Sequence, residues 1–115
     1  SDVCSSDLEI LAAGGLLAIA SDINPGTAWC ESMQFVIALA CRTLKLTPAQ
    51  ALAAATINAA AAIGRAERIG SIEAGKQADL ILLSLPDYRH LAYRFGGNLV
   101  EMVIKKGRIV HENRE

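Results

Sequence analysis

The chain has 115 residues, and its 11 basic and 12 acidic side chains leave a formal net charge of −1. Its composition, 52% hydrophobic and 4% aromatic, is typical of closely packed helices and excludes a disordered chain. The length fits one small domain at most, and the balanced charge, with no basic run beyond residues 105–108, excludes nucleic acid and anionic membranes as predicted partners.

Hydropathy and cysteine usage predict the compartment. The apolar runs are about half as long as the roughly 18 to 20 residues that a membrane span requires, so we predict a soluble protein. No secretory leader pattern is present, and the cysteines, Cys4, Cys30 and Cys41, lack the spacing of metal ligands. We therefore expect a cytoplasmic chain with reduced thiols, in which Cys41 is a small core residue.

The first segment differs from the rest of the chain. Residues 1–8 are polar and aperiodic, and we interpret them as a suspected sequencing or assembly scar, which is left out of the fold prediction. Residues 9–13 are predicted to end a helix, closed by Gly14 and Gly15, because glycine tolerates the left-handed conformation of a helix C-cap.

An uninterrupted apolar run over residues 16–20 leads into a polar turn at residues 21–27. Such a run, bounded by turn-forming residues on both sides, predicts a strand buried on both faces, as in a parallel sheet covered by helices. Asp22 then lies at the carboxyl end of the strand, where barrels of parallel strands gather their catalytic groups. Two interpretations stay open: Asp22 is a catalytic carboxylate, or its side chain only bonds nearby backbone amides in a turn.

Two helices are predicted after this turn. Residues 31–44 are apolar around nearly the whole circumference, so we expect this helix to be buried on more than one side. Thr47, Pro48 and Gln50 form a specific helix start, with threonine as N-cap, proline at the first position and glutamine completing a capping box. The alanine-rich helix that follows is expected to bend or divide at Asn58 and to end at Gly64.

Beyond Arg65 the pattern changes from helix to strand. Residues 70–75 predict a short strand and turn, residues 79–84 a buried strand, and residues 99–104 with 108–110 a hairpin that turns at Lys106 and Gly107. An aromatic segment lies at residues 86–98, and residues 112–115 form a charged tail that we expect to fray. Because one βα unit cannot close a barrel, we infer that residues 9–64 end a larger α/β domain.

Four segments carry a family resemblance. Residues 20–27, 46–52, 70–80 and 91–98 are similar to the C-terminal quarter of the imidazolonepropionase family of metal-dependent amidohydrolases, and the resemblance covers residues 9–110. The second and third segments recur across amidohydrolases, whereas the Asp-x-Asn-Pro-Gly-Thr turn and residues 91–98 point to this one family. The implied fold class is α/β: residues 9–64 are the C-terminal end of a (β/α)8 TIM-type barrel, and residues 65–115 are part of a small β-sandwich domain.

The resemblance also implies a site and a reaction. Asp22 would end barrel strand eight, bind one catalytic metal ion, zinc or iron, and position or deprotonate the attacking water. Asn24, Gly26 and Thr27 would contact a small-molecule substrate. The implied reaction is hydrolysis of the ring amide C–N bond of 4-imidazolone-5-propanoate to N-formimidoyl-L-glutamate in histidine degradation. Whether the parent enzyme is a homodimer stays open.

The chain departs from a complete enzyme of this family in its histidines. The metal sites of the family use a His-x-His pair and further histidines, whereas this sequence has only His90 and His111. We expect His90 to be structural and His111 to be solvated, so the remaining metal ligands lie outside this chain. The segment at residues 28–30 also differs from the small polar residues that we expect after the turn. We predict that the 115 residues alone are inactive.

Two alternative functions stay open. Another amidohydrolase, such as a heterocyclic base deaminase or a cyclic amide hydrolase, would share Asp22 and the β domain, but the turn at residues 24–27 and the segment at residues 93–96 argue against it. A non-catalytic interaction domain would unfold cooperatively as an isolated chain. A fragment would instead expose apolar faces that belong against missing strands.

Overall fold

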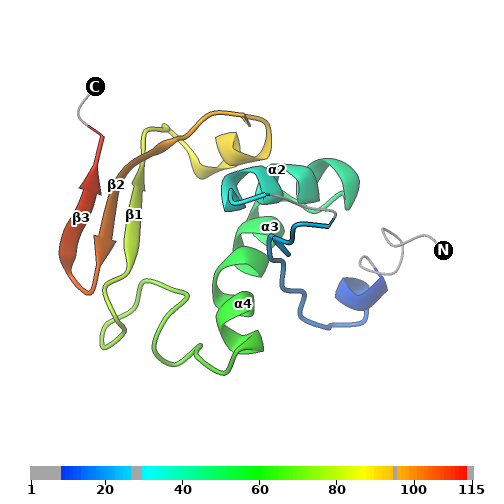
Figure 1. Cartoon of the computed structure of the whole chain (residues 1–115). Helices are drawn as coiled ribbons and strands as arrows, with labels where there is room; N and C mark the ends of the chain where they lie inside the picture. Colours follow the sequence, from blue (N-terminus) through cyan, green and yellow to red (C-terminus); the bar gives the residue numbers. More distant parts are fainter. Residues whose placement is uncertain (1–8, 27–29, 95, 114–115) are drawn as a thin grey trace.

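The computed structural model describes residues 9–26, 30–94 and 96–113. The helices gather on one side of the molecule and a small sheet on the other, and a long irregular connection after α4 joins them (Figure 1). The elements, in chain order, are α2 (Met33–Thr43), α3 (Pro48–Ala55), α4 (Ile57–Ala62), β1 (Leu80–Leu83), η1 (Tyr88–Ala92), β2 (Val100–Lys105) and β3 (Arg108–Glu112). Among the described residues, no helix is both long and apolar enough to cross a membrane. The proposed scar at residues 1–8 lies outside the described residues.

A glycine cap ends the first helical segment, as the sequence predicted. Residues 9–12 are helical, and Gly14 has the left-handed φ of 83°. The amide of Gly14 donates to the Leu11 carbonyl and that of Gly15 to the Ile10 carbonyl, over 3.0 and 2.8 Å. These two bonds form the Schellman motif, which satisfies carbonyls that the helix itself leaves unpaired.

The strand predicted at residues 16–20 is wrong for the structure of this chain. The segment is not part of a hydrogen-bonded ladder, and Leu16 is 76% exposed, whereas Leu17 and Ile19 are half-buried. The Ile19 amide donates to the Ala54 carbonyl over 3.1 Å, and Asn58 Nδ2 donates to the Leu17 carbonyl over 3.0 Å. One face of the segment therefore rests on α3 and α4, while a ladder needs a neighbouring strand that the structure does not place beside it.

Helix α2 is confirmed, but only one side of it is covered. Ser32 caps it by accepting a hydrogen bond from the Phe35 amide. Ile37 is buried with its neighbours Ala38 and Ala40, whereas Phe35 and Leu39 are 39% and 43% exposed. The expected burial on more than one side is therefore wrong among the described residues. An apolar side of this kind normally packs against another element.

The capping box at the start of α3 is confirmed. Thr47 Oγ1 accepts from the Gln50 amide over 3.2 Å, and Gln50 Oε1 accepts from the Thr47 amide over 2.9 Å. The predicted division of the alanine-rich helix also occurs, but at Thr56, which has φ −119° and ψ −91°, and not at Asn58. Asn58 instead lies inside α4 and uses its amide for the bond to Leu17. Gly64, with φ 72°, follows Ile63, the C-cap of α4.

The sheet has the order β1-β2-β3 and is antiparallel throughout. Lys106 and Gly107 have φ of 51° and 80°, so the predicted hairpin turn is confirmed with the two left-handed residues of a type I′ turn. Residues 70–75 form turns and no strand. The strand predicted at residues 79–84 is present as β1, but it is not buried, because Ile81 and Leu82 are 56% and 50% exposed.

Asp79 ties the start of β1 to the hairpin turn. Its Oδ1 accepts from the Lys106 amide over 2.9 Å, and its Oδ2 accepts from Lys105 Nζ over 3.0 Å and from Gln77 Nε2 over 2.6 Å. The Lys106 amide, followed by the Lys105 ammonium, lowers the pKa of the Asp79 carboxyl. A carboxylate at this position thus joins the start of β1 to the end of β2, at one end of the first strand pair.

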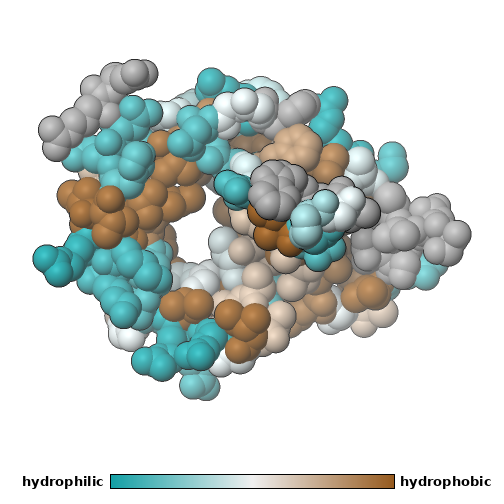
Figure 2. All heavy atoms as spheres, viewed as in Figure 1, coloured by the Kyte–Doolittle hydropathy of each residue, from teal (hydrophilic) through white to brown (hydrophobic). Residues whose placement is uncertain are grey.

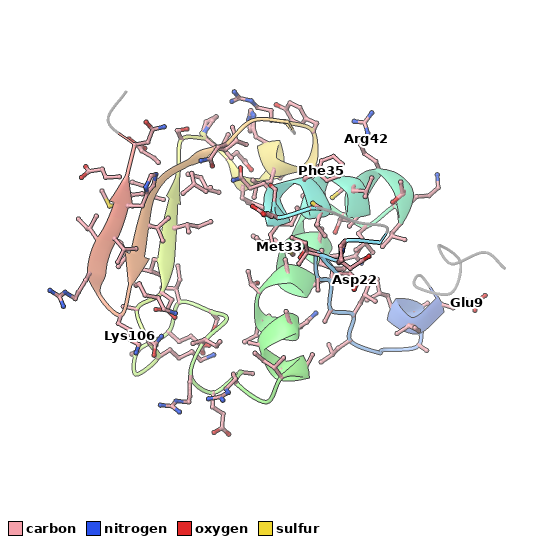
Figure 3. The ribbon with its side chains drawn as sticks, viewed as in Figure 1. Glu9, Asp22, Met33, Phe35, Arg42 and Lys106 are labelled. Atoms are coloured by element: carbon pink, nitrogen blue, oxygen red, sulfur yellow. The ribbon has the colours of Figure 1, made fainter. Side chains whose placement is uncertain are left out.

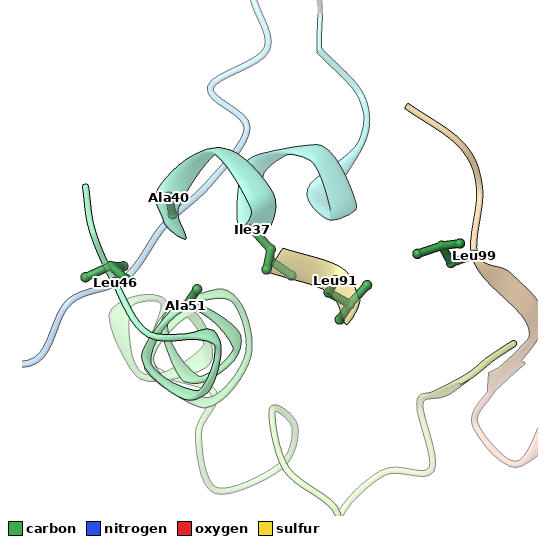
Figure 4. Close-up of a cluster of buried hydrophobic side chains, with 6 residues drawn as sticks. All are labelled: Ile37, Ala40, Leu46, Ala51, Leu91 and Leu99. Atoms are coloured by element: carbon green, nitrogen blue, oxygen red, sulfur yellow. The ribbon is translucent and has the colours of Figure 1, made fainter. Parts of the chain in front are cut away.

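The core joins the helices to the segment that precedes β2. Six buried apolar side chains form one cluster (Figure 4): Ile37, Ala40, Leu46, Ala51, Leu91 and Leu99. The alanines let α2 and α3 approach closely, as their frequency in the sequence predicted. The sheet does not close onto α3 and α4, and the space-filling view shows an opening between them (Figure 2). Cys41 is a half-buried free thiol, and burial raises its pKa.

Candidate active site

The candidate site is the turn at residues 22–26. Asp22 has a φ of 48°, a left-handed conformation in which aspartate and asparagine are enriched among non-glycine residues. Asn24 Nδ2 donates to the Asp22 carbonyl over 2.8 Å, and Asn24 Oδ1 accepts from the Gly26 amide over 3.0 Å. The amide of Asn24 therefore closes the turn on both sides, as Asx turns do.

Gly26 leaves room for this arrangement. A Cβ atom at Gly26 would lie 3.2 Å from Asn24 Oδ1, closer than most real contacts of that kind. Its amide is bonded to Asn24 and is thus not a free donor in this structure. Thr27, the third residue predicted to contact substrate, lies outside the described residues, as do Ala28 and Trp29.

The structure holds the chain on both sides of the turn. On the upstream side, Asn58 and the Ala54 carbonyl anchor residues 17–19 to the two small helices. On the downstream side the chain enters α2, whose first turn carries Gln34. Gln34 bonds the side chain of Asn98 and the backbone of Leu99, more than 60 residues further along the chain. The turn therefore lies between two anchored segments.

Asp22 presents a carboxylate that is available to a ligand. The residue is exposed, and within the described residues its carboxylate has no hydrogen-bond or ion-pair partner. Figure 3 shows Asp22 on the segment that leads from the N-terminal helix into α2. An unpaired carboxylate is a suitable ligand for a divalent metal.

One carboxylate is not a complete metal site. Among the described residues there is no group of three or more histidine, cysteine, aspartate or glutamate side chains that could hold a metal ion. His111 lies in β3 opposite Val103 and is exposed, as expected. Asp22 alone therefore does not make up the four-ligand set that a protein-bound zinc usually has.

His90 is engaged within its own segment. A hydrogen bond of 2.7 Å joins His90 Nδ1 and Tyr93 Oη, and the two ring centroids lie 5.2 Å apart. Asp87 caps this 3-10 turn through the Arg89 amide and pairs with the Arg89 guanidinium over 2.7 Å, which lowers the pKa of the Asp87 carboxyl to about 2. These contacts agree with the structural role that we expected for His90.

Sequence reasoning missed two residues that anchor the helix after the turn. Gln34 is a half-buried amide in an otherwise apolar helix start, and Asn98 ends the aromatic segment. A polar side chain on the apolar side of α2 was the signal that could have found Gln34, because buried amides are normally paired. Its partner could not have been found, because no local pattern links residue 34 to residue 98.

Two clefts lie near the sheet and away from the turn. One of about 470 Å³ is lined by residues between 68 and 78 and by Lys106, and the other, of about 280 Å³, by residues between 63 and 79 and by Lys105. Neither of these two clefts includes Asp22 or Asn24.

Comparison with known proteins gives consistent relatives. Residues 6–110 match the model of the amidohydrolase family. The chain is 58% identical over 105 residues to an imidazolonepropionase of Herpetosiphon aurantiacus and 52% identical over 103 residues to one of Shouchella clausii. These alignments cover 91% and 90% of this chain but 25% and 23% of the relatives. The chain thus spans about a quarter of the length of the curated relatives that it matches, and the predicted resemblance is confirmed.

Solved structures support the fold. An amidohydrolase from Thermotoga maritima superposes with a TM-score of 0.74 at 29% identity, covering 96% of this chain and 26% of that one. A guanine deaminase from E. coli gives a TM-score of 0.73 at 21% identity, covering 93% of this chain and 30% of that one, which is a likeness of fold alone. The predicted α/β fold of an amidohydrolase is confirmed by these superpositions.

Proposed function

Because the chain belongs to the amidohydrolase family, we propose that it is the C-terminal part of an enzyme that hydrolyses 4-imidazolone-5-propanoate to N-formimidoyl-L-glutamate. The observation that carries this proposal is the identity to curated imidazolonepropionases, which is 58% in the most similar relative described above. The reaction opens the ring amide C–N bond with water, and it is a step of histidine degradation.

Asp22 is the proposed catalytic residue and metal ligand. Its carboxylate is exposed and has no partner among the described residues, and the turn that carries it is closed by two hydrogen bonds of Asn24; both features support these roles. A bound zinc or iron ion would supply Lewis-acid chemistry, polarising the ring carbonyl and making the attacking water more acidic. Asp22 then accepts the proton that the attacking water loses, and a general base must lie within hydrogen-bond distance of that proton.

Asn24, Gly26 and Thr27 are the proposed substrate contacts. Asn24 and Gly26 are bonded to each other in this structure, and this bond shapes the turn proposed to face the substrate. If either residue binds the substrate directly, the bond between them would be exchanged for a hydrogen bond to the substrate. An imidazolone ring and a propionate arm offer both donors and acceptors for such an exchange. The substrate is a small molecule, and the proposal includes no nucleic-acid or membrane partner.

The rest of the enzyme supplies what this chain lacks. Asp22 is the one metal ligand proposed in this chain, so we propose that the 115 residues alone are inactive and that the complete protein is active. A cytoplasmic location and a homodimeric parent are the matching proposals for a metabolic enzyme of this kind. The division at residues 64 and 65 into a barrel part and a β part also remains a prediction.

The test is an assay of the full-length protein that contains this chain. It is incubated with 4-imidazolone-5-propanoate, and the products are identified by mass spectrometry together with an assay for ammonia. We expect a product heavier by one water and no ammonia. Release of ammonia from this or another heterocycle would instead favour a deaminase, and no turnover by a folded, metal-loaded protein would favour a non-catalytic domain.

A further inference from the structure

Gln34 is bonded through both atoms of its side-chain amide. Its Oε1 accepts from the Leu99 amide and its Nε2 donates to Asn98 Oδ1, each over 2.9 Å. Asn98 Oδ1 also accepts from the Val100 amide over 3.0 Å. The Gln34 side chain thus pairs with the Leu99 amide and with Asn98 Oδ1, just before β2. Because both groups of this half-buried amide are bonded, its orientation is fixed.

These bonds fasten the first turn of α2 to a distant segment. Gln34 follows the N-cap Ser32 by two positions, so its bonds act on the start of α2. This helix follows the turn at residues 22–26, here named the substrate turn, along the chain. Apolar packing continues the same contact one turn later, where Ile37, Leu91 and Leu99 belong to the buried cluster (Figure 4). The start of α2 is therefore joined to the segment before β2 by hydrogen bonds at Gln34 and by packing at Ile37.

We propose that Gln34 is a positioning residue for the substrate turn. Its bonds tie down the start of α2, which follows this turn along the chain, as Asn58 and the Ala54 carbonyl tie down residues 17–19, which precede it. This inference rests on the proposed function, because it assigns Gln34 to the same turn. Substrate-positioning elements matter because a small displacement of a bound group lowers the rate or the affinity strongly.

The proposed role of Gln34 also assigns a function to residues 91–98. That segment includes no metal ligand and no residue of the turn, yet it resembles one enzyme family closely. Its last residue, Asn98, orients Gln34 and thereby acts on the turn from outside the site. The aromatic part of the segment is kept in place by Asp87 and by the bond between His90 and Tyr93.

The test uses three variants of the full-length protein that contains this chain. Gln34→Leu removes both bonds at nearly constant size. Gln34→Glu keeps the acceptor for the Leu99 amide but loses the donor to Asn98. Asn98→Asp is the matched control, because it keeps the oxygen that accepts from Gln34 and from the Val100 amide. Each variant is assayed for kcat and KM on 4-imidazolone-5-propanoate, and amide hydrogen exchange is measured at Leu99.

We expect both Gln34 variants to raise KM roughly tenfold, which corresponds to the loss of one well-made hydrogen bond, with kcat changed less than about threefold. Asn98→Asp should leave KM within about twofold of the wild type. Gln34→Leu should also speed exchange of the Leu99 amide, whereas Asn98→Asp should not. A merely structural role would reduce the folded fraction, and hence the apparent kcat, without moving KM.

The outcomes separate the two proposals. Wild-type turnover together with an unchanged KM in both Gln34 variants would overturn the positioning role alone. No turnover in the wild type would overturn the proposed function, and the positioning role with it. If Gln34→Leu does not fold, Gln34→Glu decides, because it preserves the bond to the Leu99 backbone.

Discussion

Replacing Ala51 with leucine tests the close packing that positions the site. Ala51 is 0% exposed and lies in the cluster where α2 and α3 meet (Figure 4). The same helix carries the Ala54 carbonyl, which receives the Ile19 amide three residues before Asp22. A larger side chain at position 51 must push α3 away from α2, and the displacement reaches the anchor of the candidate site.

The size of the destabilisation expected for Ala51→Leu follows from the lack of space around Ala51. Burying the added carbon atoms would gain about 0.8 kcal/mol per methylene if a cavity were present. Ala51 is fully enclosed, so the gain is not realised and overpacking costs about 1 to 3 kcal/mol instead. Ala49→Leu is the matched control, because Ala49 is exposed on the same helix and the change there costs less than about 0.5 kcal/mol.

The assay is urea unfolding of the full-length protein that contains this chain. We expect Ala51→Leu to lower the denaturation midpoint with an unchanged m-value, and Ala49→Leu to leave the midpoint nearly unchanged. Equal midpoints for the two variants would refute the reasoning, since the two changes are chemically identical and differ only in burial.

Three further predictions follow from single contacts. Thr47→Ala removes half of the capping box and should destabilise the protein by about 1 kcal/mol in urea unfolding, whereas Thr47→Ser should not; equal stability of both would show that the box is energetically silent. The lowered pKa of Asp79 adds stability that is present above its ordinary value of 3.8 and is lost as the pH falls through the lowered pKa, so Asp79→Asn should flatten the acid dependence of stability measured between pH 2 and 6. If the stability of Asp79→Asn depends on acid pH as steeply as that of the wild type, Asp79 does not contribute to this dependence. Asn24→Ala should weaken substrate affinity by about 1 to 3 kcal/mol, measured as KM in the full-length enzyme, and a KM unchanged from wild type would contradict its role.

Local chemistry explains which elements were predictable. The capping box at Thr47, the glycine caps at Gly14 and Gly64, and the Lys106–Gly107 turn depend on neighbouring residues alone, and each was found where the sequence predicted it. Such signals act within one turn of chain, so a single sequence contains all the information they need.

Elements that depend on distant partners were not predictable in the same way. Residues 16–20 have the composition of a strand, but a ladder forms only beside another strand, and the structure rests them on α3 and α4 instead. The burial predicted for α2 and for β1 was wrong for the same reason. Burial of their apolar residues depends on contacts with other elements, and local sequence does not show whether those elements are present. The bond between Gln34 and Asn98 is likewise invisible to local patterns.

The same distinction between local signals and distant partners applies to the candidate site. Family resemblance identified Asp22 and its turn, and the structure shows how Asn24 and Gly26 close that turn. The sequence also predicted that the other metal ligands lie outside this chain, and that stays a prediction. What holds the turn in place, at Asn58 and Gln34, became visible only in three dimensions.

The most direct measurement of the central claim compares Asp22→Asn with the wild type in the full-length protein. Turnover of 4-imidazolone-5-propanoate and bound metal are measured on the same samples, with circular dichroism as the control for folding. We predict a loss of turnover by several orders of magnitude, roughly 4 kcal/mol or more in the activation barrier, in a variant that keeps the wild-type fold. Near-normal turnover by a folded, metal-loaded Asp22→Asn variant would contradict the account.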